Sequence, residues 1–184
     1  WAMEQGDMDR AWEVIDADVM PGGAWGPPIN VLTDAASFLF RAELAGAPRR
    51  DDLWHTVSSY AAKSFPNPGI AFADMHAALA HSMAGNSEAL ERIITDAKGP
   101  AKDLVSETGD AYRAFARQDW TGVIDHLTSV MPAHERLGGS RAQRDLLEFT
   151  MLNALLKSGR SEEAERLLRV RRPAKAGAHA VAGL

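Results

Sequence analysis

The chain has 184 residues, no cysteine, 46% hydrophobic residues and a net charge of −5 at neutral pH. This composition suits a folded domain and excludes disulfide bonds, thiolate metal sites, a cysteine nucleophile and collagen-like or largely disordered chains. The wholly apolar runs are far shorter than the ~20 residues that span a bilayer, so we predict no membrane segment.

Charge is distributed unevenly along the chain. Residues 141–184 hold nine Lys and Arg against five Asp and Glu, whereas residues 1–140 hold eleven against twenty. Aromatic residues do not alternate with the Lys and Arg residues of the basic end. Cations are also expected in the last turn of a helix, where they offset its dipole. The sequence therefore does not favour binding to nucleic acid.

Helical periodicity dominates the chain, and alternating strand patterns are almost absent. Turns that open a helix recur at offsets of 40, 39, 33 and 41 residues, at Gly6, Gly46, Gly85, Gln118 and Gly159. Repeats of this length with two helices each are typical of stacked helical hairpins, in which every hairpin buries its apolar face on its neighbours. We predict an all-α, right-handed superhelix of about ten helices in five hairpins, the first one truncated.

Several local signals predict boundaries in chain order. Pro21–Ile29 contains three prolines and three glycines, and it is expected to be an extended linker with Trp25 packed back on the helices. Asn67 and Pro68 predict an N-cap and the first residue of a helix. Gly109, inside a helical pattern, indicates a close-packing site or a kink.

The chain is predicted to divide into a helical-repeat domain, residues 1–172, and a short end. Residues 173–184 are small and rich in glycine and alanine, and are expected to be a tail or a partial capping helix. An apolar face left uncovered at the end of the array would favour self-association, so the sequence is compatible with a homo-oligomer.

The stretch LGGSRAQRD, residues 137–145, resembles a phosphate-binding loop only in its glycines. A Walker loop has the pattern G-x-x-x-x-G-K-[ST] after a strand, and this stretch lacks the spacing, the lysine and the strand. Ser140 and Gln143 stand in the relation of a capping box instead. We therefore predict a helix start here.

Three stretches share an order of residues with a known repeat family: DAASFLFRAELAG (34–46), FADMHAALAHSMAG (72–85) and LGGSRAQRDLLEFTMLNALLKSG (137–159). Over most of residues 1–172 the chain resembles the C-terminal half of the tetratricopeptide repeat protein 38 family, and GGSxAQRD is the most specific part. The resemblance implies an all-α superhelix in the cytoplasm and no known reaction. The chain departs from the repeat pattern at Gln118, which replaces a turn glycine, and at Gly122 and Val123, which replace a Glu-Ala pair.

The histidines and serines carry no recognisable catalytic or metal pattern. Asp74 and His76 are two residues apart, His81 follows five later, and His126 and His134 are eight apart. Metal ligands on one helix face need a spacing of three or four. With no G-x-S-x-G elbow either, we predict no metal, no cofactor and no enzymatic activity.

Polar residues in the first helices of successive hairpins are the candidate ligand- or peptide-binding set: Asp34, Arg41, Asp74, His76, Arg144 and Asp145. Two interpretations stay open. These residues form ion pairs that fix the stacking of the repeats, because buried charge must be paired. Alternatively, they line a concave groove in which Arg41 and Arg144 bind a peptide carboxylate or backbone.

The sequence as a whole favours a scaffold that binds an unknown protein or peptide on its concave face. The alternative is an enzyme-like or small-molecule pocket on that face, built from Asp34, Arg41, Asp74 and His76. Solvent access to Asp74 or His76 in a deep pocket would favour the alternative.

Overall fold

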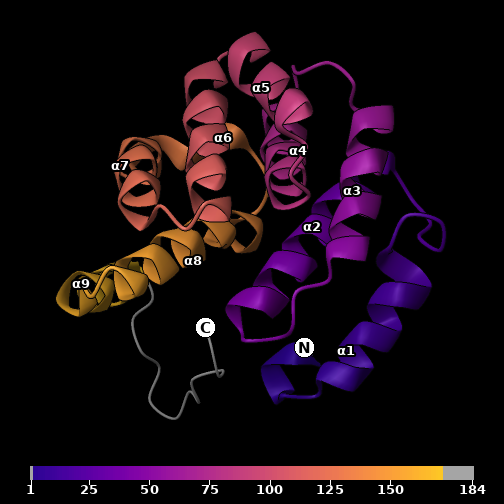
Figure 1. Ribbon diagram of the computed structural model, residues 1–184, viewed down its shortest axis with the longest axis horizontal. Helices are drawn as coiled ribbons and strands as arrows, with labels where there is room; N and C mark the ends of the chain where they lie inside the picture. Colours follow the sequence, from indigo (N-terminus) through magenta and orange to yellow (C-terminus); the bar gives the residue numbers. More distant parts are fainter. Residues whose placement is uncertain (1, 172–184) are drawn as a thin grey trace.

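A computed structural model describes residues 2–171 (Figure 1), so the predicted end segment 173–184 lies outside the described residues. Within the described range the protein consists of helices and contains no strand, which confirms the all-α prediction. The α-helices are α1 (Met8–Val14), α2 (Pro28–Leu44), α3 (Asp51–Ser64), α4 (Ala71–Met83), α5 (Ser87–Asp96), α6 (Lys102–Ala116), α7 (Trp120–Val130), α8 (Arg141–Lys157) and α9 (Ser161–Arg171). Short helices of other types are η1 (Met3–Gln5), the π-helix η2 (Ile15–Val19) and η3 (Met131–Leu137). None of the described helices is long and apolar enough to cross a membrane.

Helices from α2 onward pack as sequential pairs: α2 on α3, α4 on α5, α6 on α7 and α8 on α9. The predicted turns separate the members of each pair. Gln118 confirms the turn signal most clearly, because it adopts the left-handed φ of +58° although it is not a glycine. Asp119 then donates its backbone N–H to the carbonyl of Ala114 at 2.9 Å, which closes the end of α6.

Helix α4 lies at the centre of the protein. It contacts α2, α3, α5, α6 and η3, and every residue from 73 to 83 is buried. Four alanines in this stretch let the neighbouring helices approach closely on several sides. A helix that is buried all round belongs to a core rather than to a free surface.

Helix α8 packs against α7 and also against α2, which is about a hundred residues earlier in the chain, since Arg41 binds Ala142 across a separation of 101 residues. In Figure 1, α1 and α9 lie at opposite sides of the molecule with the other pairs between them. A row of repeats that touched only its neighbours would not contain this contact. The array is therefore tied together between an early and a late hairpin.

Gly109 is a close-packing site, as the sequence indicates. It lies in α6, and a Cβ at this position would come within 2.6 Å of Ile94 Cγ1 on α5. The glycine therefore lets α6 approach α5.

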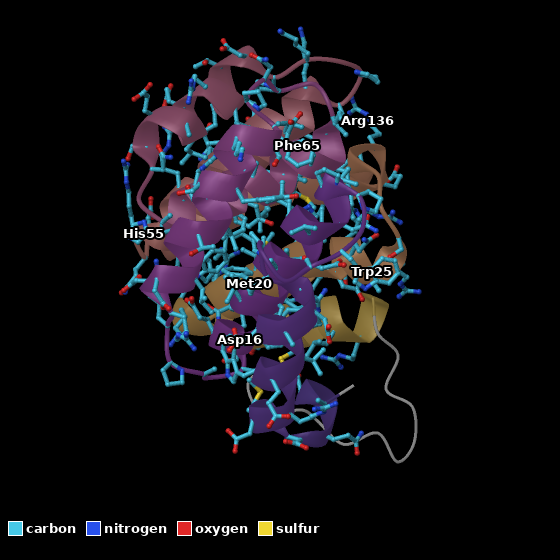
Figure 2. The ribbon with its side chains drawn as sticks, turned by 90° about the vertical axis from the view of Figure 1, so that its right-hand side faces the viewer. Asp16, Met20, Trp25, His55, Phe65 and Arg136 are labelled. Carbon is cyan, nitrogen blue, oxygen red and sulfur yellow. The ribbon has the colours of Figure 1, made fainter. Side chains whose placement is uncertain are left out.

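Two sequence predictions about boundaries are wrong. Trp25 does not pack back on the helices, since it is 88% exposed (Figure 2) and Met20, 6% exposed, fills the core beside this turn. Helix α4 begins at Ala71 rather than after Asn67. Its first turn is capped from within, because the Asp74 carboxylate accepts the backbone N–H of Gly69 at 2.9 Å.

Candidate functional site

Arg41, in the last turn of α2, binds the beginning of α8. Its Nη2 donates to the carbonyl of Ala142 at 2.7 Å, and its guanidinium carbon lies 4.8 Å from the centre of the Phe149 ring. A hydrogen bond from a charged donor contributes about 1.5–3 kcal/mol and a cation–π contact about 0.5–1 kcal/mol. Arg41 thus joins two hairpins that are distant in sequence.

Arg144 holds the loop that precedes α8. Its Nη1 donates to the carbonyl of Gly139 and reaches that of Gly138 at 3.5 Å, while its Nε is buried without a hydrogen-bond partner. Asp145, the next residue, is half-buried on the same helix. The α2–α8 junction, defined here as Arg41, Phe72, His76, Gly139 and Arg144, therefore contains two cations that bind main-chain carbonyls.

His76 is enclosed in this junction. The ring lies edge-on to Phe72 with 4.7 Å between centroids, and Nδ1 donates to the Phe72 carbonyl at 2.8 Å. Complete burial, with a smaller contribution from the charge of Arg41, lowers the pKa of His76 to about 4. The imidazole is neutral at pH 7, and its buried Nε2 has no partner.

Tyr112 on α6 is a second buried group near Arg41. Burial raises the pKa of its phenol, the Arg41 charge opposes this, and the hydroxyl has no partner. The interior beside Arg41 therefore contains polar groups. Their spacing along the sequence does not distinguish them from ordinary core residues.

Two of the three aspartates of the candidate set, Asp34 and Asp74, lie outside this junction. Asp74 is 3% exposed and binds the Gly69 N–H, and burial raises the pKa of its carboxyl. Asp34 is exposed on α2, and partial desolvation raises its pKa. The structure thus brings Arg41, His76 and Arg144 together, but it uses Asp74 as a cap and leaves Asp34 on the surface.

The LGGSRAQRD stretch forms the loop and cap that the sequence predicts. The Ser140 hydroxyl accepts the Gln143 N–H at 3.3 Å, and the Gln143 side chain accepts the Ser140 N–H at 2.7 Å. Both bonds of the capping box are present. What the sequence does not reveal is that Gly139 lies directly against the Phe72 ring.

We expect Gly139→Ala to lower the free energy of unfolding by about 2–4 kcal/mol. The left-handed φ of +76° disfavours any side chain by about 1–2 kcal/mol. A Cβ would also overlap the Phe72 ring, with Cδ2 only 2.9 Å away, and such overpacking costs about 1–3 kcal/mol more. Urea unfolding measures the loss.

Gly159→Ala is the matched control for this change. Its φ is +73°, and a Cβ there meets no atom within 4 Å, so only the backbone term of about 1–2 kcal/mol is expected. Equal losses in the free energy of unfolding for the two variants would mean that the close contact between Gly139 and Phe72 does not affect stability.

A groove between α8 and α9 forms an apolar concavity among the described residues. Its volume is about 630 Å³, and the end of α2 closes one side of it. Leu156 is 54% exposed and Leu168 is 40% exposed, and both side chains line the same concavity. The α8–α9 groove is lined by Leu44, Phe149, Leu152, Asn153, Leu156, Lys157, Ser161, Ala164, Glu165 and Leu168.

Sequence reasoning did not select the groove residues as a site. One signal was present, because Leu152, Leu155 and Leu156 place apolar side chains on two faces of α8. Leu152 and Leu155 are buried in the core, while Leu156 points to the groove. A second apolar face on a helix that already has a core face indicates a further contact.

Comparisons with known proteins assign no family to the chain, since no family model and no solved structure matches it.

Proposed function

We propose that the protein is a tetratricopeptide-like helical-repeat module, stacked as a right-handed superhelix, that binds a partner protein through the α8–α9 groove. The observation that carries this proposal is the exposed leucine pair, Leu156 and Leu168, on the wall of a concavity of about 630 Å³. The sequential helix pairs and the left-handed turn residue Gln118 support the repeat assignment.

The groove has stronger support as a binding surface than the polar residues of the first helices. Arg41 and Arg144 already donate to main-chain carbonyls of the chain itself, and Asp74 caps α4. These contacts favour the structural interpretation, in which the polar residues hold the hairpins in register. The enzyme-like alternative has little support, because Asp74 and His76 are enclosed.

The partner that fits this surface best is an amphipathic helix. Six of the lining residues are apolar, and Asn153, Lys157, Ser161 and Glu165 provide a polar rim around them. An apolar centre within a polar rim is the usual anatomy of a protein interface. A helix also suits a face made of two helices, which is how each hairpin in such arrays receives the next.

Selection from a displayed library of short amphipathic helices tests this proposal. We expect binders whose affinity falls at least about tenfold in Leu156→Asp, because docking would bury an unpaired carboxylate among apolar side chains. Ile70→Asp is the control, since Ile70 is 55% exposed and lies outside the groove. The affinity of the Ile70→Asp variant for the selected helices is expected to equal that of the unaltered protein.

Two results would contradict the proposal. Binders that respond equally to Leu156→Asp and Ile70→Asp would place the docking surface elsewhere. Sedimentation that detects a dimer, lost in Leu156→Asp, would make a second copy of the chain the occupant of the groove instead of a partner protein.

A further inference from the structure

A second concavity, of about 390 Å³, lies where the end of α4 meets α5 and the end of α6. Most of its surface is polar, unlike the α8–α9 groove. We call it the arginine cleft, and it is defined by Arg49, Ser82, Glu91, Arg113 and Arg117. Arg49 comes from the loop before α3, Arg113 from the last turn of α6, and Arg117 is the residue that follows this helix.

Carboxylates hold Arg49 in place. Its Nε donates to Asp51 at 2.6 Å, its Nη1 donates to Glu43 at 3.4 Å, and its Nη2 binds the Met83 carbonyl at the end of α4. Asp51 and Glu43 do not line the cleft. They therefore fix the orientation of the guanidinium from outside the cleft. In doing so, they neutralise part of its positive charge.

Arg113 is held in a similar way. Its Nη2 donates to Glu91 at 2.5 Å, and its Nη1 lies 3.5 Å from Asp110 on the same helix. Glu91 is the single carboxylate among the lining residues, so it is the group that an incoming anion would meet.

Two donors of the cleft are unmatched. The side chain of Arg117 is exposed and makes no hydrogen bond or ion pair with any described residue. Ser82 is 7% exposed, and its hydroxyl is buried without a partner. A buried hydroxyl without a partner is uncommon in folded proteins and marks a place where an acceptor is missing.

We propose that the arginine cleft binds the phosphate group of a small molecule. Three guanidinium groups, from the loop before α3 and from the end of α6, and a hydroxyl suit a tetrahedral oxyanion, whereas a planar carboxylate is satisfied by one guanidinium fork. Arg117 supplies the charge that no internal carboxylate neutralises, and Ser82 lies in the wall, where a rotation about its Cα–Cβ bond would turn the enclosed hydroxyl toward the phosphate. This site is separate from the α8–α9 groove and does not depend on the proposed function.

Calorimetric titration with inorganic phosphate at low ionic strength tests the proposal. We expect saturable binding that Arg117→Gln weakens about tenfold, since it removes a charge-assisted contact. Glu91→Gln is expected to tighten binding severalfold, because it removes the opposing carboxylate and releases Arg113. Glu88→Gln makes the same charge change on the same helix outside the cleft, and it should leave the affinity unchanged.

Ser82→Ala separates binding from folding. Because the hydroxyl has no partner in the protein, its removal should weaken phosphate binding while the melting temperature stays the same. Absence of saturable binding would overturn the proposal, as would equal effects of Glu91→Gln and Glu88→Gln. Acetate that binds as tightly as phosphate would overturn the assignment to a phosphate group.

Discussion

Acidification from pH 7 to pH 4 is expected to destabilise the protein by several kcal/mol. Burial lowers the pKa of both His76 and His81 to about 4, from 6.5 for an unhindered imidazole, and a cation adds to the effect in each case. His81 is 2% exposed, and its Nδ1 lies 2.8 Å from the Ser58 hydroxyl, which keeps the ring inside the fold.

The sign follows from which state takes up protons. Below pH 6.5 the unfolded chain protonates these histidines while the folded chain does not, so stability falls with pH until about pH 4. Each histidine contributes a slope of up to about 1.4 kcal/mol per pH unit. Asp34 and Asp74 act in the opposite direction at the acidic end, because their raised pKa values let the folded state bind protons first.

Urea unfolding at a series of pH values between 7 and 4 measures this dependence. His76→Gln should reduce the slope by up to about 1.4 kcal/mol per pH unit, whatever its effect on the stability at pH 7. His55→Gln controls for the loss of an imidazole at an exposed position (Figure 2) and should leave the slope unchanged. A slope unaffected by His76→Gln would show that His76 protonates equally well in both states.

Trp54→Ala is expected to lower the free energy of unfolding by about 3–5 kcal/mol. Trp54 is fully buried in α3, within the core, and its indole N–H donates to the Glu43 carboxylate. The substitution leaves a large cavity and removes a donor from a carboxylate that is half-buried. Such a loss is a large share of the total stability of about 5–15 kcal/mol that a domain has.

Trp25→Ala is the matched control, because Trp25 is 88% exposed (Figure 2) and its loss should change stability by no more than about 0.5 kcal/mol. The loss of stability in Trp54→Phe should fall between the losses in Trp54→Ala and Trp25→Ala, since phenylalanine keeps most of the side-chain volume but lacks the N–H. Urea unfolding of the three variants checks this order. Similar losses for Trp54→Ala and Trp25→Ala would contradict the placement of Trp54 in the core.

The candidate site was only partly predictable from the sequence. Arg41 and Arg144 were selected as polar residues in the first helices of two hairpins, and both do lie at the junction of those hairpins. Asp34 was selected by the same pattern and lies on the surface, because helical periodicity does not state which neighbour covers a face. The leucines of the groove and the arginines of the cleft were missed, since each set comes from separate elements.

The sequence by itself determined the helical class, the turns between paired helices and the capping box at Ser140, because these depend on interactions over three to five residues. Tertiary structure alone decided that α8 reaches α2, that Gly139 rests on Phe72 and that Leu156 stays exposed. These features depend on packing between residues that are distant in the chain, and no local spacing encodes such contacts.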